Sequence, residues 1–384
     1  MAAASDKARF FLEQSVPELK EFERKKIFSS EEISKIARQR SDFEHKINAR
    51  GSTPSDYIRY AEFEMNVDSL RKKRVKRLGV KSTAHNGQRR IFFVFDRGTK
   101  RHPSDVGLWL QSIEYAKKQQ AHKKLSQIFA NALRLHPTRP ELWIYAAQSA
   151  MEDNGDMTEA RAYMQRGLRF NKNKKALWLQ YLRLEMSYIA KLQTRREILG
   201  IGRGGETSDA DPVDERQVPA LTADDVAPQT QGDDVDAKAL ENMREAPAQS
   251  GAIPIAIFDA AMTQFNNDPH LTQDVLYMLE DYTHVKATAR VLYHLRDSLD
   301  RLARRSWVRD ACEVWTPVVG LQPNSADFPP AFRSSLKSLR EAQKKTSQQA
   351  ELAAWAKRWL QRLLEAEDLD PAIRRVAESV SQSL

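Results

Sequence analysis

Apolar residues recur along most of this chain at the three- and four-residue spacing that places them on one face of a helix. In the segment 30–48, for example, Ile33, Ile36, Phe43 and Ile47 fall on a single stripe. No stretch alternates apolar and polar residues for long enough to support a sheet. The pattern therefore predicts an all-α protein.

Helix starts are marked near the N-terminus. Ser15 and Glu18 have the spacing of a capping box, with a proline in the first turn, and Ser29 and Glu32 have the same spacing. The stretch "RGSTPSD" then interrupts the helical pattern, and we expect a third helix to begin at Pro54. These signals predict two helices before residue 50 and a long one after it.

An internal repeat follows. Trp109, Trp143 and Trp178 are spaced 34 and 35 residues apart, and each is preceded by leucine. A second apolar segment belongs to each repeat: "RRIFFVFDRGTKRHP", "LSQIFANALRLHP" and "ARAYMQRGLRFNK". In this register "RIFFVFDRG", which alone resembles a strand, is predicted to be a helix. A period of about 34 residues made of paired helices is typical of an α-solenoid.

The stretch that begins at Tyr57 follows the same pattern, because its aromatic residues and its glutamate match those of the repeat at Trp178. Each helix pair has an apolar face that it cannot cover alone, so we interpret the aromatic positions as packing residues. These residues are Tyr57, Tyr60, Trp109, Trp143, Trp178 and Tyr181.

Charge is distributed unevenly along the chain. The formal net charge is +9, yet residues 200–250 contain twelve acidic and four basic residues, which leaves +17 for the remainder. This acidic segment is rich in Gly and Pro and is predicted to be a disordered loop. The basic remainder indicates a polyanionic partner. The single cysteine, Cys312, and the short apolar runs predict an intracellular protein without disulfides or membrane spans.

The sequence offers little chemistry for catalysis. "GIGRGG" at 200–205 matches a dinucleotide-binding motif, but no strand precedes it and an acidic segment follows it. There is no phosphate-binding "GKS" or "GKT", no H-E-x-x-H and no G-x-S-x-G. We therefore expect no enzymatic activity, no cofactor, no metal site and no catalytic residue; a dinucleotide-dependent enzyme is the rival of a different class.

The run "RKKRVKR" extends the helix that begins at Pro54. At 100° per residue, Lys72, Lys73, Lys76 and Arg77 point away from the apolar stripe and are candidates for RNA phosphate contact. Arg71 and Arg74 fall within the stripe, so we expect them to pair with acidic residues or to pack their stems. A solvated face or a nuclear address is the alternative for the outward four. For three other basic runs, at 117–124, 169–175 and 301–309, a solvated face is favoured.

The repeat pattern resembles the half-a-TPR repeat, and the N-terminal block adds a more specific resemblance. "VPELKEFERKKIFSSEEISKIARQRSDFEHKI" followed by "DYIRYAEFEMNVDSLRKKRVKRLG" resembles the half-a-TPR subunit of the UtpB subcomplex of the small-subunit processome. The resemblance implies an α-α superhelix that acts as a nucleolar scaffold on precursor rRNA together with the U three snoRNP. It also implies partners among the WD-repeat propeller proteins of that subcomplex. The same-pattern alternative is a half-a-TPR scaffold in pre-mRNA splicing or 3′-end processing.

Four regions follow from these patterns. They are a helical partner-docking segment (1–50), repeats with a basic insertion at 66–89 (51–199), the acidic loop (200–250) and further helical repeats (251–384). Deleting the first region is expected to release the protein from its subcomplex.

Overall fold

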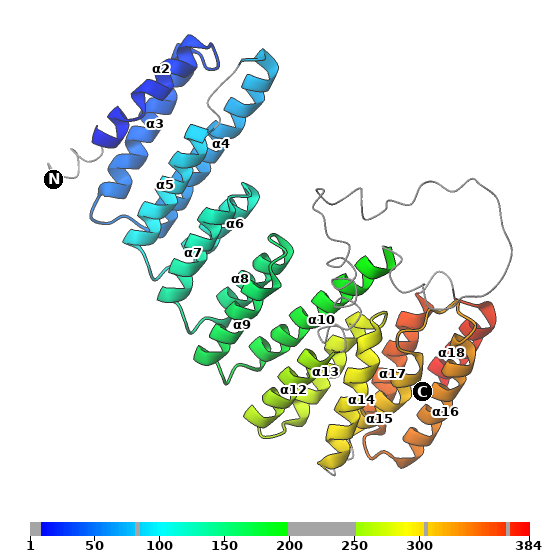
Figure 1. Cartoon of the computed structure of the whole chain (residues 1–384). Coiled ribbons are helices and arrows are strands. Elements are labelled where there is room, and N and C mark those ends of the chain that lie inside the picture. Colours follow the sequence, from blue (N-terminus) through cyan, green and yellow to red (C-terminus); the bar gives the residue numbers. More distant parts are fainter. Residues whose placement is uncertain (1–8, 81–84, 199–250, 303–305, 366–368) are drawn as a thin grey trace, which may run out of the picture. The chain divides into compact units, whose positions relative to one another are not determined.

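The computed structural model describes residues 9–80, 85–198, 251–302, 306–365 and 369–384, and every regular element within them is helical (Figure 1). The predicted all-α helical-repeat fold is confirmed. The chain divides into two compact units, residues 1–146 and 147–384, with the boundary inside one helix. The finer boundaries predicted at residues 50, 199 and 250 remain predictions, and the acidic segment lies outside the described residues.

The first unit is a series of consecutive antiparallel helices (Figure 1). They are α2 (Val16–Arg24), α3 (Ser30–Asn48), α4 (Pro54–Leu78), α5 (His85–Arg101), α6 (Val106–Lys118), α7 (His122–Leu135) and the beginning of α8 (Pro140–Glu152). The segment "RIFFVFDRG" lies in α5, as the repeat register predicted.

Two apolar clusters hold this unit together. One joins α2, α3 and α4 around residues such as Phe22, Ile36 and Val67. The other joins α3 to α6 around Tyr60 and Phe95. Each fully buried large apolar side chain contributes about 1.5–3 kcal/mol, so the two clusters bind the helices before residue 50 firmly to those after it.

Gly98 allows α5 to approach its neighbours closely. A Cβ atom at this position would lie 3.0 Å from Leu108 Cδ2 and 3.0 Å from Tyr57 Cγ. Contacts this short force neighbours to move, so glycine fits here where a larger residue would separate the helices.

The helix ends agree with the sequence in one case and differ in another. Ser29 and Glu32 form the predicted capping box at the start of α3, with bonds of 2.9 and 3.3 Å. The box predicted at Ser15 is wrong: Ser15 has helical backbone angles, and its hydroxyl donates to the carbonyl of Leu12 at 2.7 Å. Residues 9–13 are already helical, so the chain enters α2 through a turn and needs no extended N-cap.

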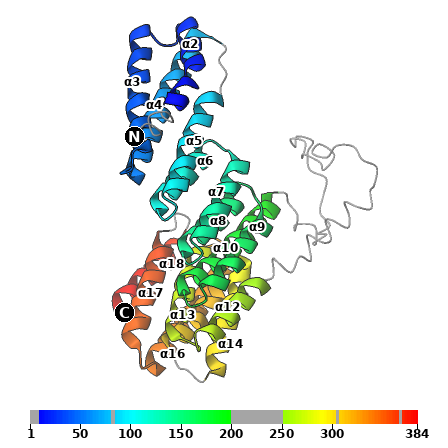
Figure 2. The same ribbon diagram turned by 90° about the vertical axis from the view of Figure 1, so that its left-hand side faces the viewer.

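The second unit continues with helical pairs of similar kind (Figures 1 and 2). After the end of α8 come α9 (Met157–Phe170), α10 (Lys175–Ile198), α12 (Ala252–Gln264), α13 (Pro269–Leu279), η3 (Glu280–Tyr282), α14 (Lys286–Arg301), α15 (Trp307–Trp315), η4 (Thr316–Val318), α16 (Phe328–Lys345), α17 (Gln349–Leu364) and α18 (Pro371–Ser383).

Tryptophans anchor the core of the second unit. Trp355 and Trp359 stack with their ring centroids 5.9 Å apart, and the indole of Trp355 donates to the buried Glu280 carboxylate at 3.0 Å. Cys312 is completely buried, and burial raises the pKa of its thiol. A thiol in this state is a packing group and a poor nucleophile.

No helix within the described ranges is both long enough and apolar enough to span a membrane.

Candidate functional site

The repeated tryptophans fasten each repeat to the turn before it. The indole nitrogen of Trp109 donates to the carbonyl of Pro103 at 3.0 Å, six residues earlier. Trp143 and Trp178 form the same bond, each 2.9 Å long and each to the carbonyl six residues earlier. The tryptophan is thus both an apolar anchor and a hydrogen-bond donor, which explains why phenylalanine would not be equivalent at this position.

The other aromatic positions lie in the core. Tyr57, Tyr60, Trp109, Trp143 and Tyr181 are buried, whereas Trp178 is partly exposed. Tyr60 stacks on Phe43, with ring centroids 5.1 Å apart. Five of the six side chains thus have the buried positions expected of packing residues.

A bidentate ion pair recurs between paired helices. In the first unit Arg40 Nε and Nη2 donate to the two oxygens of Glu64 at 2.7 and 2.8 Å, across 24 residues. In the second unit Arg161 and Glu185 form the same two bonds at the same lengths and the same sequence separation. The glutamate was recognised in the sequence as part of the repeat, whereas its pairing with the arginine was missed. The fixed 24-residue spacing is the signal that could have revealed it.

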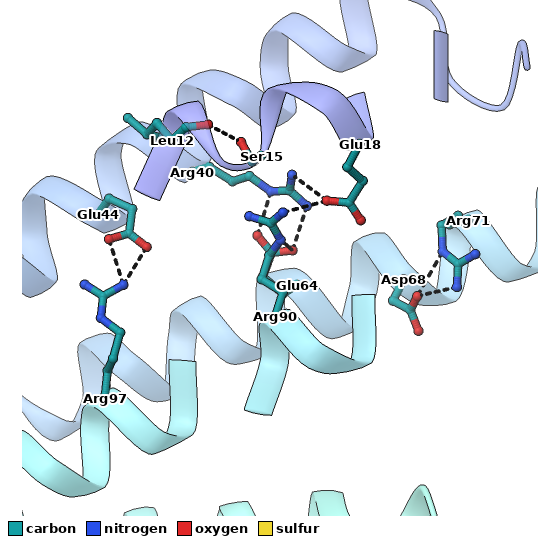
Figure 3. Close-up of polar contacts among 10 residues, drawn as sticks. All are labelled: Leu12, Ser15, Glu18, Arg40, Glu44, Glu64, Asp68, Arg71, Arg90 and Arg97. Atoms are coloured by element: carbon teal, nitrogen blue, oxygen red, sulfur yellow. Dashed lines mark hydrogen bonds and ion pairs between the residues drawn. The ribbon is translucent and has the colours of Figure 1, made fainter. Parts of the chain in front are cut away.

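In the first unit this pair belongs to a buried network of four charges (Figure 3). Arg40 Nη1 lies 3.5 Å from Glu18, and Arg90 lies 2.6 Å from Glu18 and 3.8 Å from Glu64. Two cations thereby balance two carboxylates across α2, α3, α4 and α5. Burial by itself would lower the pKa of Arg40, but the charge and hydrogen bonds of Glu64 and then Glu18 raise that pKa above its ordinary value.

The basic run "RKKRVKR" occupies the last turns of α4, which ends at a left-handed Gly79. Lys72, Lys73, Lys76 and Arg77 are all exposed, as the helical periodicity predicted. They differ in one respect. Lys72 forms an ion pair of 2.9 Å with Asp68, a residue that the sequence reasoning had not singled out.

The side chains of Lys73, Lys76 and Arg77 form no hydrogen bond or ion pair with any residue that the structure describes. Three unpaired cations therefore face solvent over the last two turns of α4. They can meet phosphate groups without first breaking an internal contact.

The two inward arginines form the internal pairs that were predicted. Arg71 donates to Asp68 through Nε and Nη2 at 3.0 and 2.8 Å (Figure 3). Arg74 binds both oxygens of Glu32, at 2.6 and 2.7 Å, and also lies over the ring of Phe28. The hydrogen bond from Arg74 is the main reason that the pKa of Glu32 falls to about 2.

The other basic runs contain cations that are already paired. Arg309 binds Asp300 and Glu313 at 2.7 Å each. Lys175 forms an ion pair with Asp268. Pairing of this kind makes Arg309 and Lys175 less available to an external anion than Lys73, Lys76 and Arg77.

Metal binding finds no geometric support in the described parts of the chain. No group of three or more His, Cys, Asp or Glu side chains there could hold a metal ion. The glycines of "GIGRGG" lie outside the described residues.

Comparison with known proteins concerns mainly the helices that carry the buried charge network and the basic run. A family model described as "U3 small nucleolar RNA-associated protein 6" matches residues 12–94, which contain α2, α3, α4 and most of α5. The N-terminal match is to the U3 small nucleolar RNA-associated protein 6 family.

Curated members of the same name extend the similarity. The chain is 36% identical over 227 residues to the Schizosaccharomyces pombe U3 small nucleolar RNA-associated protein 6, an alignment that covers 58% of this chain and 46% of that protein. It is 35% identical over 190 residues to the Homo sapiens homolog and 30% identical over 189 residues to the Dictyostelium discoideum homolog. These alignments cover 48% and 49% of this chain but only 32% and 31% of the two relatives. The chain thus spans less than half the length of these relatives.

Proposed function

We propose that this chain is a non-enzymatic scaffold of the small-subunit processome. In this proposal it assembles on precursor rRNA together with the U3 snoRNP, in the nucleolus, and is needed for processing toward the small-subunit rRNA. The observation that carries the proposal is the family match over residues 12–94, which falls on the helices joined by the buried charges.

The proposed protein partners are the WD-repeat propeller proteins of the UtpB subcomplex. We propose these partners because the N-terminal block resembles the half-a-TPR subunit of that subcomplex. Repeats of paired helices offer extended surfaces for such partners.

Affinity purification separates this function from its nearest alternative, a scaffold of pre-mRNA splicing or 3′-end processing. The tagged chain would be purified from cells at moderate salt, and U3 RNA and the spliceosomal small nuclear RNAs would be measured by quantitative reverse transcription. Enrichment of U3 RNA alone is expected. Enrichment of a spliceosomal RNA without U3 RNA would replace the proposal with the alternative.

Within this function we assign direct RNA contact to the exposed end of α4. If Lys73, Lys76 and Arg77 each neutralise one phosphate, the logarithm of the binding constant should fall with the logarithm of salt concentration with a slope of about −2 to −3. Reversing the charges of all three residues should remove most of that slope. Lys72 is better left intact, because a glutamate there would lie beside Asp68 and disturb the internal pair of Arg71.

A control with the same number of exposed basic residues lies on α16, where Arg333, Lys337 and Arg340 form an exposed stripe. Reversal of these three residues changes the net charge by the same amount. The RNA assignment requires weaker crosslinking to precursor rRNA in cells for the α4 variant than for the α16 variant. Equal crosslinking of both variants would show that the end of α4 does not contact RNA and is a solvated face or a nuclear address.

Partner docking by residues 1–50 needs a different test from deletion. Deletion removes Glu18 and Arg40 from the buried network and Phe22 from the apolar cluster, so the rest of the first unit would lose its packing. Substitutions on the exposed surface of this segment test docking without that loss.

A further inference from the structure

Three phenylalanines form a contiguous aromatic surface on the first unit. Phe10 is 55% exposed and Phe93, on α5, is 40% exposed. Phe11 lies between them, with ring centroids 5.5 Å from Phe10 and 5.2 Å from Phe93. Single exposed apolar residues are common on protein surfaces, but adjoining exposed rings are typical of an interaction site. We call Phe10, Phe11 and Phe93 the aromatic cluster.

Two rings of the aromatic cluster, Phe11 and Phe93, contact a guanidinium that is itself held by an internal ion pair. The guanidinium of Arg97 lies 4.3 Å from the ring centre of Phe11 and 5.2 Å from that of Phe93. Arg97 is itself held by both oxygens of the buried Glu44, at 2.9 Å each, as Figure 3 shows. A surface whose rings are fixed before binding loses little conformational freedom when a partner covers it.

Charge pairing around the aromatic cluster disfavours a nucleic acid as its occupant. The cation of Arg97 is neutralised by Glu44, and Arg9 pairs with Glu13 at 2.9 Å. Proteins that stack single-stranded bases on aromatic rings also provide a groove of free cations for the phosphates. Here Arg97 and Arg9 are already paired with acidic residues, which suits apolar side chains of a protein better than a phosphate backbone.

One nearby cation is not paired. Arg89 is exposed on α5 one turn before Phe93, on the same helix face, and forms no ion pair with a described residue. An acidic residue in the partner would complement it.

We propose that the aromatic cluster and Arg89 form a docking site for a short segment of another protein that presents large apolar side chains and an adjacent acidic residue. This docking site rests on the proposed scaffold function in one respect: it treats the first unit as a part of the chain that binds other proteins. Its test uses neither RNA nor a processome protein, so its outcome and that of the U3 RNA measurement can be told apart.

The probe is a phage-displayed library of random dodecapeptides, panned on the purified full chain. The comparison protein is the Phe10→Ser/Phe93→Ser variant, whose changes lie at the surface and should leave the chain folded, as its thermal unfolding would show. Enriched peptides are expected to contain two or more large apolar residues beside an aspartate or glutamate. They should bind the double variant at least tenfold more weakly. Two control variants, Leu135→Ser and Val376→Ser, each alter a residue that is 45% exposed elsewhere on the surface. Both controls should bind the selected peptides as the native chain does.

A charge swap gives a readout that structural damage would not mimic. Arg89→Glu should weaken the selected peptides several-fold, and replacing the peptide's acidic residue with lysine should restore binding to this variant. The proposal is overturned if no peptide is enriched relative to panning on the double variant, or if the enriched peptides bind both proteins equally. It is also overturned if a twenty-nucleotide oligouridylate binds the native chain and loses tenfold affinity in the double variant, because the cluster would then be a base-stacking surface.

Discussion

The buried network in the first unit makes Glu64→Gln a strongly destabilising substitution. The native network balances Arg40 and Arg90 against Glu18 and Glu64, and the side chains of Arg40 and Glu64 are each only 2% exposed. Glutamine keeps the size of the side chain but removes one negative charge. The remaining carboxylate, on Glu18, is then shared by the buried guanidinium of Arg40 and the partly buried one of Arg90.

The expected cost follows from the loss of one partner of a buried ion pair, which is about 3–5 kcal/mol. Hydrogen exchange measured by mass spectrometry on the full chain should show faster exchange in peptides from α3 and α4, with an opening free energy lowered by this amount. Glu62→Gln is the matched control, because Glu62 is exposed on the same helix. If Glu64→Gln altered exchange no more than Glu62→Gln, the network would not be a source of stability.

A second variant tests the cause of the effect. Replacing Arg40 with methionine and Glu64 with leucine together removes one charge of each sign and leaves Arg90 paired with Glu18. Since apolar replacement of a whole buried pair is often nearly neutral, the double variant should recover most of the lost stability. If the double variant lost as much unfolding free energy as Arg40→Met and Glu64→Leu lose in sum, packing, and not charge balance, would explain the loss.

Three further predictions concern single contacts. Gly98→Ala should lower the free energy of unfolding of the first unit by about 1–3 kcal/mol through the short contacts described above, while Gly51→Ala, with no atom within 4 Å of its Cβ, should have little effect in chemical denaturation. Arg74→Ala should raise the pKa of Glu32 from about 2 toward 4.5 in an NMR titration. The Glu32 pair should therefore stabilise the fold fully above the ordinary carboxyl pKa and lose its effect as the pH falls toward 2, by no more than about 1 kcal/mol because the pair is partly exposed. Trp143→Phe keeps an aromatic ring but removes the indole donor, and should cost about 0.5–1.5 kcal/mol in thermal unfolding.

The helical repeat could be predicted from the sequence because its signals are local and periodic. The tryptophan spacing placed "RIFFVFDRG" in a helix despite its strand-like composition, and α5 has that form. Helical periodicity also separated Arg71 and Arg74 from the outward residues of the basic run, because direction around a helix depends only on position along it.

Long-range pairing could not be predicted in the same way. The contacts of Glu18 with Arg90 and of Glu44 with Arg97 join residues that are 72 and 53 positions apart, and nothing in their local sequence indicates the partner. The capping box at Ser15 was predicted wrongly for a related reason, since the preceding residues already form a helical turn. The aromatic cluster likewise depends on a long-range contact, because residues 9–13 pack against α5, about eighty positions later in the chain.

The role in small-subunit rRNA production is tested most directly by depleting the protein and following newly made rRNA. Cells depleted of this chain would be pulse-labelled, and the mature small- and large-subunit rRNAs would be quantified over time, with re-expression of the native chain as the control. The scaffold function predicts that mature small-subunit rRNA falls several-fold while large-subunit rRNA is made at its normal rate, and that uncleaved precursor accumulates. Normal production of small-subunit rRNA after complete depletion would contradict it.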